Sequence, residues 1–335
     1  MHTDIEPAGA RCLVTGANGF IGSHLCDRLI DMGCKVFALV RRSSNLKYIS
    51  SPKIEFRFGE LRDYQSLQKA VGDIDFIFHS AGLTKARNKS EFFQVNHLGT
   101  QTLLKAIPEN RKDLNRLIYI SSQAATGPGV SDEPSNENQT PDPVSAYGRS
   151  KLLGEEEVKQ FAEKVPYVII RPTSVYGPRD TEILSFFRAA SWGIKPHFGN
   201  RKSILSLVFV DDLVDGIIMG AFSNKSRNQT YFISDGMVYE WSEIVDCLLA
   251  AFGKKGVKIT IPVRLFHLIG WLTENAFNLV GKTPMLTKEK AFEITCDNWG
   301  CSAEKAMRDF GYSPRILFKE GAVMTAKWYK DNRWL

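Results

Sequence analysis

The sequence predicts an α/β protein in which a doubly wound parallel sheet is followed by a smaller, mostly helical C-terminal lobe. In the first half of the 335 residues, short apolar runs alternate with helical patterns, which is typical of a parallel sheet covered by helices. After Pro172 this alternation ends and helical patterns follow one another. We therefore expect a sheet domain over residues 1–175, with return segments near 205–235, and a lobe over residues 176–335.

The apolar runs and the periodic segments between them give the individual elements. The predicted strands are Arg11–Thr15, Lys35–Val40, Ile54–Phe58, Phe76–His79, Arg116–Ser121 and Tyr167–Arg171. The helices predicted between them are Ile21–Met32, Tyr64–Val71, Glu91–Ile107 and Ala146–Lys164. The later helices are Glu182–Trp192, Asp211–Phe222, Trp241–Phe252, Val263–Val280, Thr287–Ile294 and Ser302–Phe310, with a strand near Tyr231–Ser234. The polar segment Gly127–Pro143 is expected to form a long surface loop, of a length that is often functional.

Composition narrows the class of protein. A hydrophobic content of 43% and a charged content of 24% are ordinary for a soluble globular chain. The net charge of +6 is scattered, so we expect no nucleic-acid partner. The six cysteines form no Cys-x-x-Cys pair, so we expect a reducing compartment and no metal site.

There is no signal-peptide pattern, and the apolar stretch Leu265–Val280 is short for a membrane span and carries polar residues. We therefore expect a cytoplasmic protein and interpret that stretch as a buried or lipid-facing amphipathic helix that does not cross a membrane.

A glycine-rich turn follows the first predicted strand. Residues 15–22 read Thr-Gly-Ala-Asn-Gly-Phe-Ile-Gly, so Gly16, Gly19 and Gly22 stand three apart between an apolar run and a helical pattern. Glycines allow the backbone to approach phosphates closely, and the start of the helix offers free N–H groups and a positive dipole end. This context indicates a dinucleotide site more strongly than an ordinary glycine-rich turn.

A tyrosine and a lysine stand four residues apart at the start of a predicted helix. Tyr147 and Lys151 therefore share one face of that helix. A free tyrosine titrates near pH 10, which is too high for acid–base work at neutral pH. A nearby ammonium favours the phenolate and lowers this pKa. Tyr147 alone would be interpreted as an amphipathic surface residue, so a catalytic role depends on the neighbouring motifs.

Hydroxyl groups supply that context. Ser121 and Ser122 end a predicted strand, and ligands of parallel sheets bind at the carboxyl ends of the strands. A hydroxyl at this place is positioned to bond a substrate carbonyl. The glycine turn, the strand-end serines and the Tyr147–Lys151 pair thus predict one common site.

Taken together, these pieces resemble the extended short-chain dehydrogenase/reductase family. The resemblance implies a Rossmann fold and an NAD(P)-dependent oxidoreductase that acts on CH–OH or C=O groups. It implies that residues 1–175 bind the coenzyme and that the C-terminal lobe binds the substrate. The matching segments are 15–22, 59–63, 79–82, 95–100, 171–178 and 210–212, together with Ser122, Tyr147 and Lys151.

The resemblance also implies roles for single residues. Ser122, Tyr147 and Lys151 are the implied catalytic set, and Lys151 also bonds the nicotinamide ribose. The other implied coenzyme contacts are Gly16, Gly19, Phe20, Ile21, Gly22, Glu60, Leu61, Ala81, Gly82, Pro172 and Val175. The family more often has Asp where this chain has Glu60, which puts that contact in doubt.

Further residues of the matching segments have supporting roles by the same resemblance. Asn96 is expected to support the cleft, and His79 to be a packing residue or part of the coenzyme shelf. Asp211 and Asp212 are expected to cap the helix that follows them. Family members often form homodimers through paired helices, so a homodimer is possible.

The residues after the second predicted strand favour NADP over NAD. NAD-specific members usually place a carboxylate there to bind the ribose 2′-OH, whereas this chain has Arg41 followed by Arg42. A guanidinium binds a 2′-phosphate through paired charged hydrogen bonds. NAD remains possible if these arginines only face water.

Two enzyme classes remain open for the substrate. One is a ketone or aldehyde reductase, or the reverse alcohol dehydrogenase, resembling the 3β-hydroxysteroid dehydrogenase and dihydroflavonol reductase branch. The other is a nucleotide-sugar epimerase or dehydratase, in which Val-Tyr-Gly-Pro-Arg-Asp at 175–180 is common. A non-catalytic coenzyme sensor is less favoured, because such relatives tend to lose the tyrosine or the lysine.

Apolar residues favour the reductase. Leu205 stands where sugar-nucleotide members carry an arginine that binds the diphosphate, and Phe209 stands where they carry a histidine. Arg179 is among the arginines that would compensate, although a solvated surface charge is the simpler interpretation. The segment 266–279 is rich in aromatic residues and would cover an apolar substrate, although core packing explains most of it. A small, fairly apolar carbonyl or alcohol substrate is therefore predicted, with Tyr147 as the acid or base.

Overall fold

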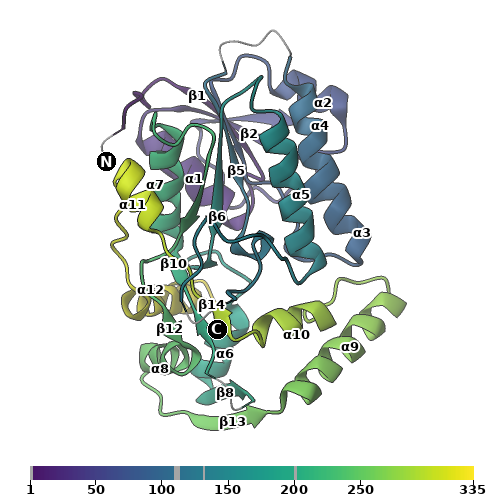
Figure 1. Ribbon diagram of the computed structural model, residues 1–335, viewed down its shortest axis with the longest axis vertical. Coiled ribbons are helices and arrows are strands. Elements are labelled where there is room, and N and C mark those ends of the chain that lie inside the picture. Colours follow the sequence, from purple (N-terminus) through teal and green to yellow (C-terminus); the bar gives the residue numbers. More distant parts are fainter. Residues whose placement is uncertain (1–2, 109–113, 131–132, 200–201) are drawn as a thin grey trace.

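The computed structural model describes residues 3–108, 114–130, 133–199 and 202–335 (Figure 1). Its centre is a parallel sheet of seven strands in the order β11-β6-β5-β4-β1-β2-β3. The strands are β1 (Arg11–Thr15), β2 (Lys35–Val40), β3 (Ile54–Phe58), β4 (Phe76–His79), β5 (Arg116–Ile120), β6 (Tyr167–Pro172) and β11 (Gln229–Ile233). The six strands predicted in the first half are confirmed to within one residue, and β11 is the predicted return strand, paired with β6.

Both faces of this sheet are buried, which is why its strands are almost continuously apolar. Neighbouring residues of a strand enter different cores: Cys12 and Val14 of β1 pack on one side, and Leu13 packs on the other. Figure 1 shows α1 and α7 on one face and α2, α4 and α5 on the other. The bounds are α1 (Phe20–Asp31), α2 (Tyr64–Ala70), α4 (Leu98–Ala106), α5 (Ala146–Gln160) and α7 (Val210–Ala221). The predicted doubly wound Rossmann-type sheet is thus confirmed.

The predicted helix Glu91–Ile107 is interrupted. The chain forms α3 (Lys89–Phe92), a π-helical turn over Phe93–His97, and then α4. The π-helical turn contains Asn96, whose side chain is buried and accepts a 2.7 Å hydrogen bond from the Leu83 N–H while donating to Ser150 Oγ at 3.0 Å. A turn with one extra residue is often found at functional sites. Here it lets Asn96 join the loop after β4 to helix α5.

The C-terminal lobe is mostly helical, as predicted, and lies below the sheet in Figure 1. Its helices are α6 (Leu184–Ser191), α8 (Trp241–Ala251), α9 (Val263–Leu279), α10 (Lys288–Ile294) and α12 (Phe318–Asp331), while α11 (Glu304–Phe310) packs beside α7 and β11. Short strands complete it: β7 (Ser174–Tyr176) with β10 (Leu207–Phe209), β8 (Ile194–Phe198) with β13 (Val257–Ile261), and β12 (Tyr239–Glu240) with β9 (Ile204–Leu205) and β14 (Asn298–Trp299).

Helix α12 is absent from the sequence-based prediction. Its segment alternates charged and apolar residues and contains Gly321, which weakens the helical pattern. Tertiary packing explains why it forms: Phe318 and Tyr329 are fully buried. A Cβ at position 321 would lie 2.3 Å from the Tyr176 hydroxyl, so glycine lets the helix approach β7.

Core packing is the wrong explanation for the apolar segment 266–279. Of the residues in α9, only Gly270 is buried, because α10 crosses it closely. Trp271 is 49% exposed and Leu279 is 89% exposed. The helix is amphipathic, but most of its apolar side chains remain at the surface.

The predicted capping role of Asp211 and Asp212 is also wrong. Helix α7 begins at Val210, so both residues lie in its first turn and neither caps it. The buried Asp212 carboxylate instead accepts hydrogen bonds from the backbone N–H groups of Arg315 and Ile316. Asp212 therefore fixes the segment that leads into α12.

A buried ion pair joins the strand ends to helix α5. Arg171 donates to both carboxylate oxygens of Glu155 at 2.9 and 2.6 Å, and Ser121 Oγ donates to the same carboxylate at 2.6 Å. All three residues are buried. Because an unpaired buried charge is costly, these contacts hold β5, β6 and α5 in one arrangement.

We predict that Arg171→Met lowers the free energy of unfolding by about 3 kcal/mol, because the buried Glu155 carboxylate keeps Ser121 and the partly exposed Lys159 but loses its buried, bidentate partner. Urea denaturation of both proteins measures this difference. Lys202→Met is the control, because Lys202 pairs with Glu240 at the surface. The Lys202 side chain is 84% exposed and the Glu240 side chain 42%, so this pair contributes below about 1 kcal/mol. Equal losses in the two variants would contradict the structural role given to the buried pair.

Candidate active site

The parallel sheet brings most of the predicted site residues to one edge. The loops at the carboxyl ends of its strands carry Gly16, Arg41, Glu60, Ala81 and Ser122, which follow β1, β2, β3, β4 and β5 in turn. The strand order reverses between β1 and β4, and ligands of such sheets bind in the crevice outside the carboxyl ends of the strands at this switch point. The position of the site therefore follows from the sheet topology. Helix α5 adds Tyr147 and Lys151, which do not lie at a strand end.

The glycine turn is built for close approach. Gly16 has φ +66°, and a Cβ there would lie 2.7 Å from the backbone of Ala81. A Cβ on Gly22 would lie 2.2 Å from the Gly16 carbonyl oxygen. These two positions need glycine because the turn, the loop after β4 and the start of α1 touch each other.

The first turn of α1 fits an anionic group. Its N-cap is Gly19, and no side chain of the described residues caps it, so the N–H groups around Phe20 and Ile21 are not masked by a capping side chain. Free N–H groups and the positive end of the helix dipole stabilise a pyrophosphate at such a place. The residues present thus fit a dinucleotide.

A hollow of about 420 Å³ adjoins this turn and contains cations that the sequence analysis did not assign. Arg179 lies in it at φ +73°, pairs with Asp27 at 2.9 Å and stacks on the ring of Tyr48. Its Nη1 atom is buried and has no hydrogen-bond partner among the described residues. The interpretation of Arg179 as a solvated surface charge is therefore wrong. The hollow is lined by Asn18, Gly19, Phe20, Asn45, Lys47, Tyr48, Arg179, Thr181 and Trp334.

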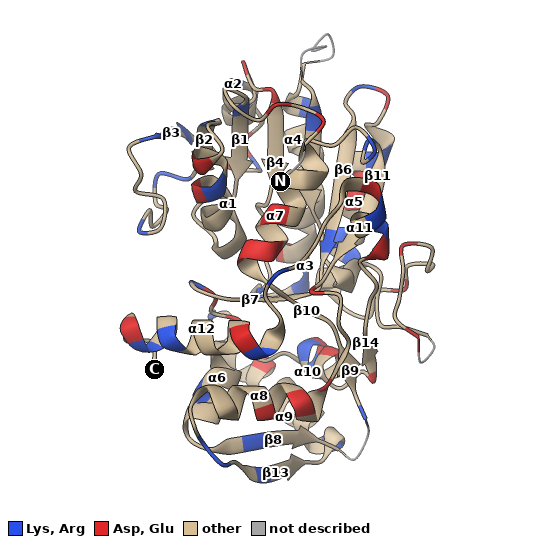
Figure 2. Cartoon of the chain, turned by 90° about the vertical axis from the view of Figure 1, so that its left-hand side faces the viewer, with Lys and Arg blue, Asp and Glu red and all other residues tan. Residues whose placement is uncertain are grey.

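The other predicted coenzyme residues surround the crevice. Leu61 and Pro172 are buried, whereas Glu60 and Arg41 are exposed at the ends of β3 and β2. Gly82 lies beside Asn96 and Lys151, since a Cβ there would be 3.1 Å from the Asn96 side chain and 3.8 Å from Lys151 Nζ. Val175 lies in β7, half-buried. Residues 41–53 between β2 and β3 carry basic but no acidic charges, as Figure 2 shows.

Tyr147 lies beside the turn that follows Ser122. Ser145 caps α5 by accepting a hydrogen bond from the Gly148 N–H, which places Tyr147 in the first turn. This turn of α5 packs directly on residues 123–125, since a Cβ on Gly148 would lie 2.2 Å from the Ala124 carbonyl oxygen. Burial raises the pKa of Tyr147, while the Ser122 side chain and the charge of Lys290 act to lower it. The phenol is therefore protonated at neutral pH and available as a proton donor.

Lys151 lies one turn further along α5 and is buried. Its ammonium donates a 2.6 Å hydrogen bond to the Ile120 carbonyl and lies 4.3 Å from the centre of the Tyr119 ring. Burial lowers the pKa of Lys151 to about 7, and the nearby Glu155 partly opposes this. The strongest cationic contribution to lowering the Tyr147 pKa comes from Lys290, so the tuning role of Lys151 stays a prediction.

His79 is a packing residue, in agreement with the sequence analysis. It is fully buried at the end of β4, and its two ring nitrogens hydrogen-bond with Thr15 Oγ1 at 2.8 Å and Thr100 Oγ1 at 3.0 Å. Burial lowers the pKa of His79 to about 3, and Lys151 adds to this effect. Its ring is therefore neutral and joins β1, β4 and α4.

The C-terminal lobe contributes Lys290, which the sequence analysis did not identify. Lys290 lies on α10, and its charge acts on Tyr147 although 143 positions separate them in the sequence. The segment Thr287–Ile294 is predicted as a helix, but no local motif marks its fourth residue, Lys290, as part of a site. Only the folded chain brings α10 next to the start of α5.

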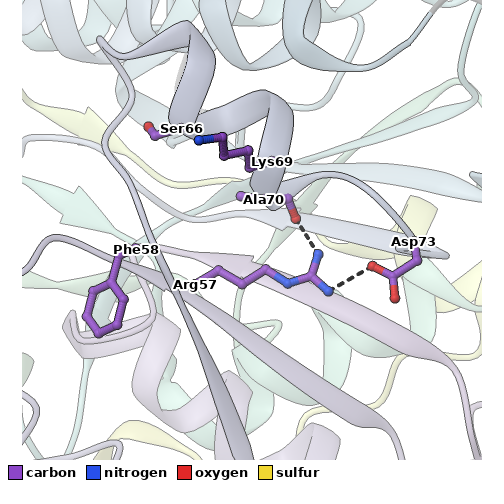
Figure 3. Close-up of a pocket in the computed structure, with 6 residues that line it drawn as sticks. All are labelled: Arg57, Phe58, Ser66, Lys69, Ala70 and Asp73. Carbon is purple, nitrogen blue, oxygen red and sulfur yellow. Dashed lines mark hydrogen bonds and ion pairs between the residues drawn. The ribbon is translucent and has the colours of Figure 1, made fainter.

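A second hollow, of about 320 Å³, lies away from this edge, between β3 and α2 (Figure 3). Its most prominent cation, Arg57, already donates to the Ala70 carbonyl and to Asp73, and it stacks 4.0 Å from the centre of the Phe37 ring. The Arg57 guanidinium is thus paired within the protein. The strand-end crevice remains the candidate active site.

The described helices have at most 17 residues, the length of α9. In the part of the chain that the structure covers, none has both the length and the apolar character that crossing a bilayer requires.

Known proteins share both the sequence pattern and the fold. The family model described as "NAD dependent epimerase/dehydratase family" matches residues 12–233. A 2-alkyl-3-oxoalkanoate reductase of Stenotrophomonas maltophilia is 28% identical, over 93% of this chain and 97% of its own. The sterol-4-alpha-carboxylate 3-dehydrogenase, decarboxylating, of Mus musculus is 25% identical, over 99% of this chain and 94% of its own.

A solved structure shows the same fold. The UDP-glucose 4-epimerase of Thermus thermophilus, in complex with NAD, superposes with a TM-score of 0.77 at 22% identity, over 96% of this chain and 99% of its own. The family match covers the glycine turn, Ser122, Tyr147 and Lys151. The chain belongs to the NAD dependent epimerase/dehydratase family of extended short-chain dehydrogenases/reductases and is an NAD(P)-dependent oxidoreductase.

Proposed function

We propose that the protein is an NADPH-dependent reductase of a ketone or aldehyde on a fairly apolar substrate, or catalyses the reverse alcohol oxidation. The observation that carries this proposal is the packing of the first turn of α5, which carries Tyr147, on the turn that follows Ser122 at the carboxyl end of the sheet. Both turns lie near the buried Lys151 and on the same edge as the glycine turn. Ser122, Tyr147 and Lys151 are the proposed catalytic residues.

The proposed mechanism assigns one task to each side chain. When bound, a nicotinamide coenzyme supplies the hydride that the carbonyl carbon accepts. Ser122 holds the carbonyl oxygen, and Tyr147 transfers its hydroxyl proton to that oxygen as the C–O π electrons move onto it. Lys151 stabilises the phenolate that remains and binds the ribose, and solvent restores the proton to Tyr147. In alcohol oxidation the same groups act in the opposite direction.

The coenzyme contacts proposed for this chain follow the crevice. The pyrophosphate lies on the turn formed by Gly16, Gly19 and Gly22, with Arg179 beside it. Ala81 and Gly82 line the shelf, and the nicotinamide end lies near Pro172 and Val175. Arg41 binds the 2′-phosphate of NADP because its guanidinium is exposed at the end of β2.

Two findings support an apolar substrate. Leu205 and Phe209, which replace polar residues of sugar-nucleotide enzymes, pack into the apolar core and so offer no charge to a diphosphate. The two relatives named above act on an alkanoate and on a sterol, both with apolar skeletons. Both names also place a carboxylate on the carbon next to the one that carries the oxygen.

The alternative is a nucleotide-sugar epimerase. It is supported by the solved epimerase of the same fold and by Arg179, whose unpaired Nη1 suits a phosphate. The position of Arg179 beside Gly19 supports the coenzyme pyrophosphate as the partner of that charge instead. Incubation with UDP-glucose separates the two functions, since an epimerase changes the sugar without net oxidation of the coenzyme.

We predict that Tyr147→Phe lowers kcat for an aliphatic ketone by about 10²–10⁴-fold, because the oxygen loses its proton donor. NADPH affinity, measured by fluorescence titration, changes little because the ring remains. Tyr64→Phe is the matched control, since Tyr64 is 45% exposed at the start of α2 and has no part in the proposed reaction. Near-normal turnover in Tyr147→Phe would refute the assigned role.

We predict that Arg41→Asp shifts the ratio of kcat/KM for NADPH over NADH towards NADH by at least about tenfold, because a carboxylate repels the 2′-phosphate and accepts a ribose hydroxyl. Steady-state rates with both coenzymes measure the ratio. Lys53→Asp makes the same charge change at an exposed site and controls for general electrostatics. An unchanged ratio in Arg41→Asp means that the 2′-phosphate is bound elsewhere.

A further inference from the structure

Helix α10 is fastened to the start of the helix that carries Tyr147. Glu289 accepts a 2.7 Å hydrogen bond from the Ala146 N–H, and it also pairs with Arg149 at 3.2 Å. Glu293 accepts a hydrogen bond from the hydroxyl of Ser145, the N-cap of α5. Figure 1 shows α10 next to this end of α5. The C-terminal lobe thus reaches the reaction centre through this helix.

Lys290 lies between these two anchoring carboxylates in the sequence. Its Nζ pairs with Glu293 Oε2 at 3.1 Å, and the side chain is 52% exposed. An ammonium has three N–H donors, so this pairing leaves donors for a ligand. Ser145 holds the Glu293 carboxylate in place, and Glu293 in turn positions the Lys290 ammonium.

The groups that act on Lys290 come from different sides of the crevice. Partial burial acts to lower its pKa, but Glu293, Glu182 and Tyr147 together raise the pKa above its ordinary value. Lys290 therefore stays charged. Glu182 is engaged elsewhere, by Lys85 at 3.1 Å. The Lys290 ammonium is thus a positive charge held through Glu293 next to Ser145, two residues before Tyr147.

We propose that Lys290 binds a carboxylate of the substrate, placed on the carbon next to the carbonyl carbon, so that the preferred substrates are 3-oxo acids and the corresponding 3-hydroxy acids. This inference rests on the proposed function and names its substrate class. An ammonium recognises a carboxylate as a compact point charge and with charge-assisted hydrogen bonds. With the carbonyl oxygen held by Ser122 and Tyr147, a carboxylate two bonds from the carbonyl carbon extends towards α10. Lys290 is then a specificity-determining residue.

The test compares 3-oxododecanoate with its methyl ester, which has the same chain without the charge. Initial rates of NADPH oxidation give kcat/KM for each compound. The wild-type protein is expected to prefer the acid, and Lys290→Met to lower the acid-to-ester ratio of kcat/KM by about 10–100-fold, mainly through KM for the acid. Lys290→Arg is expected to retain most of the ratio. The ratio cancels any effect of Lys290 on Tyr147, because that effect acts on both compounds.

Lys288→Met is the matched control, since Lys288 is exposed on the same helix. It is expected to leave the ratio as in the wild type. A wild-type preference for the ester, or an unchanged ratio in Lys290→Met, would overturn the role of Lys290 while the reductase function stands. If neither compound supports NADPH oxidation, the proposed function itself fails, and the inference fails with it.

Discussion

The parallel pairing of β1 with both β2 and β4 is the constraint on which the rest of the molecule depends. It places the glycine turn at the centre of the sheet and directs the neighbouring strand ends to the same edge. Because both faces of the sheet are buried, the strands cannot shift register without exposing a core. The loops of the crevice therefore begin at fixed positions along this edge.

Polar contacts fix the elements that carry the reacting groups to the sheet. The buried Glu155 carboxylate joins Ser121 and Arg171, so α5 is fixed to the ends of β5 and β6. Asn96 fixes the loop after β4 to α5 in the same way. Groups that must meet within hydrogen-bond distance are thus positioned by contacts that do not take part in the reaction. Such a preformed arrangement reduces the reorganisation needed when substrate binds.

The sequence predicted the parts of the fold that follow local rules. Strands buried on both faces give continuous apolar runs, and the glycine spacing marks the first turn, so both were recognised. Tyr147 and Lys151 were found because they stand one helical turn apart. Helix α12 was missed because its pattern is weak and its packing against Tyr176 is a tertiary effect. The exposure of α9 was missed because an apolar segment alone does not show whether anything covers it.

The positively charged residues near the site, Arg179 and Lys290, are harder to predict from the sequence than its hydroxyl groups. Arg179 looked like a surface residue, yet the fold holds it at a positive φ beside the glycine turn. Lys290 has no local signal at all, because its position depends on how α10 contacts α5. Long-range docking decides such positions, and a single sequence contains no direct record of it.

Transfer of deuterium tests the central claim most directly. NADPH labelled with deuterium on the transferred side of C4 is mixed with an aliphatic ketone and the protein, and the product is analysed by mass spectrometry. The account predicts one deuterium on the carbinol carbon and one NADP⁺ for each alcohol formed. An unlabelled product, or turnover of a sugar nucleotide with no net coenzyme oxidation, would contradict it.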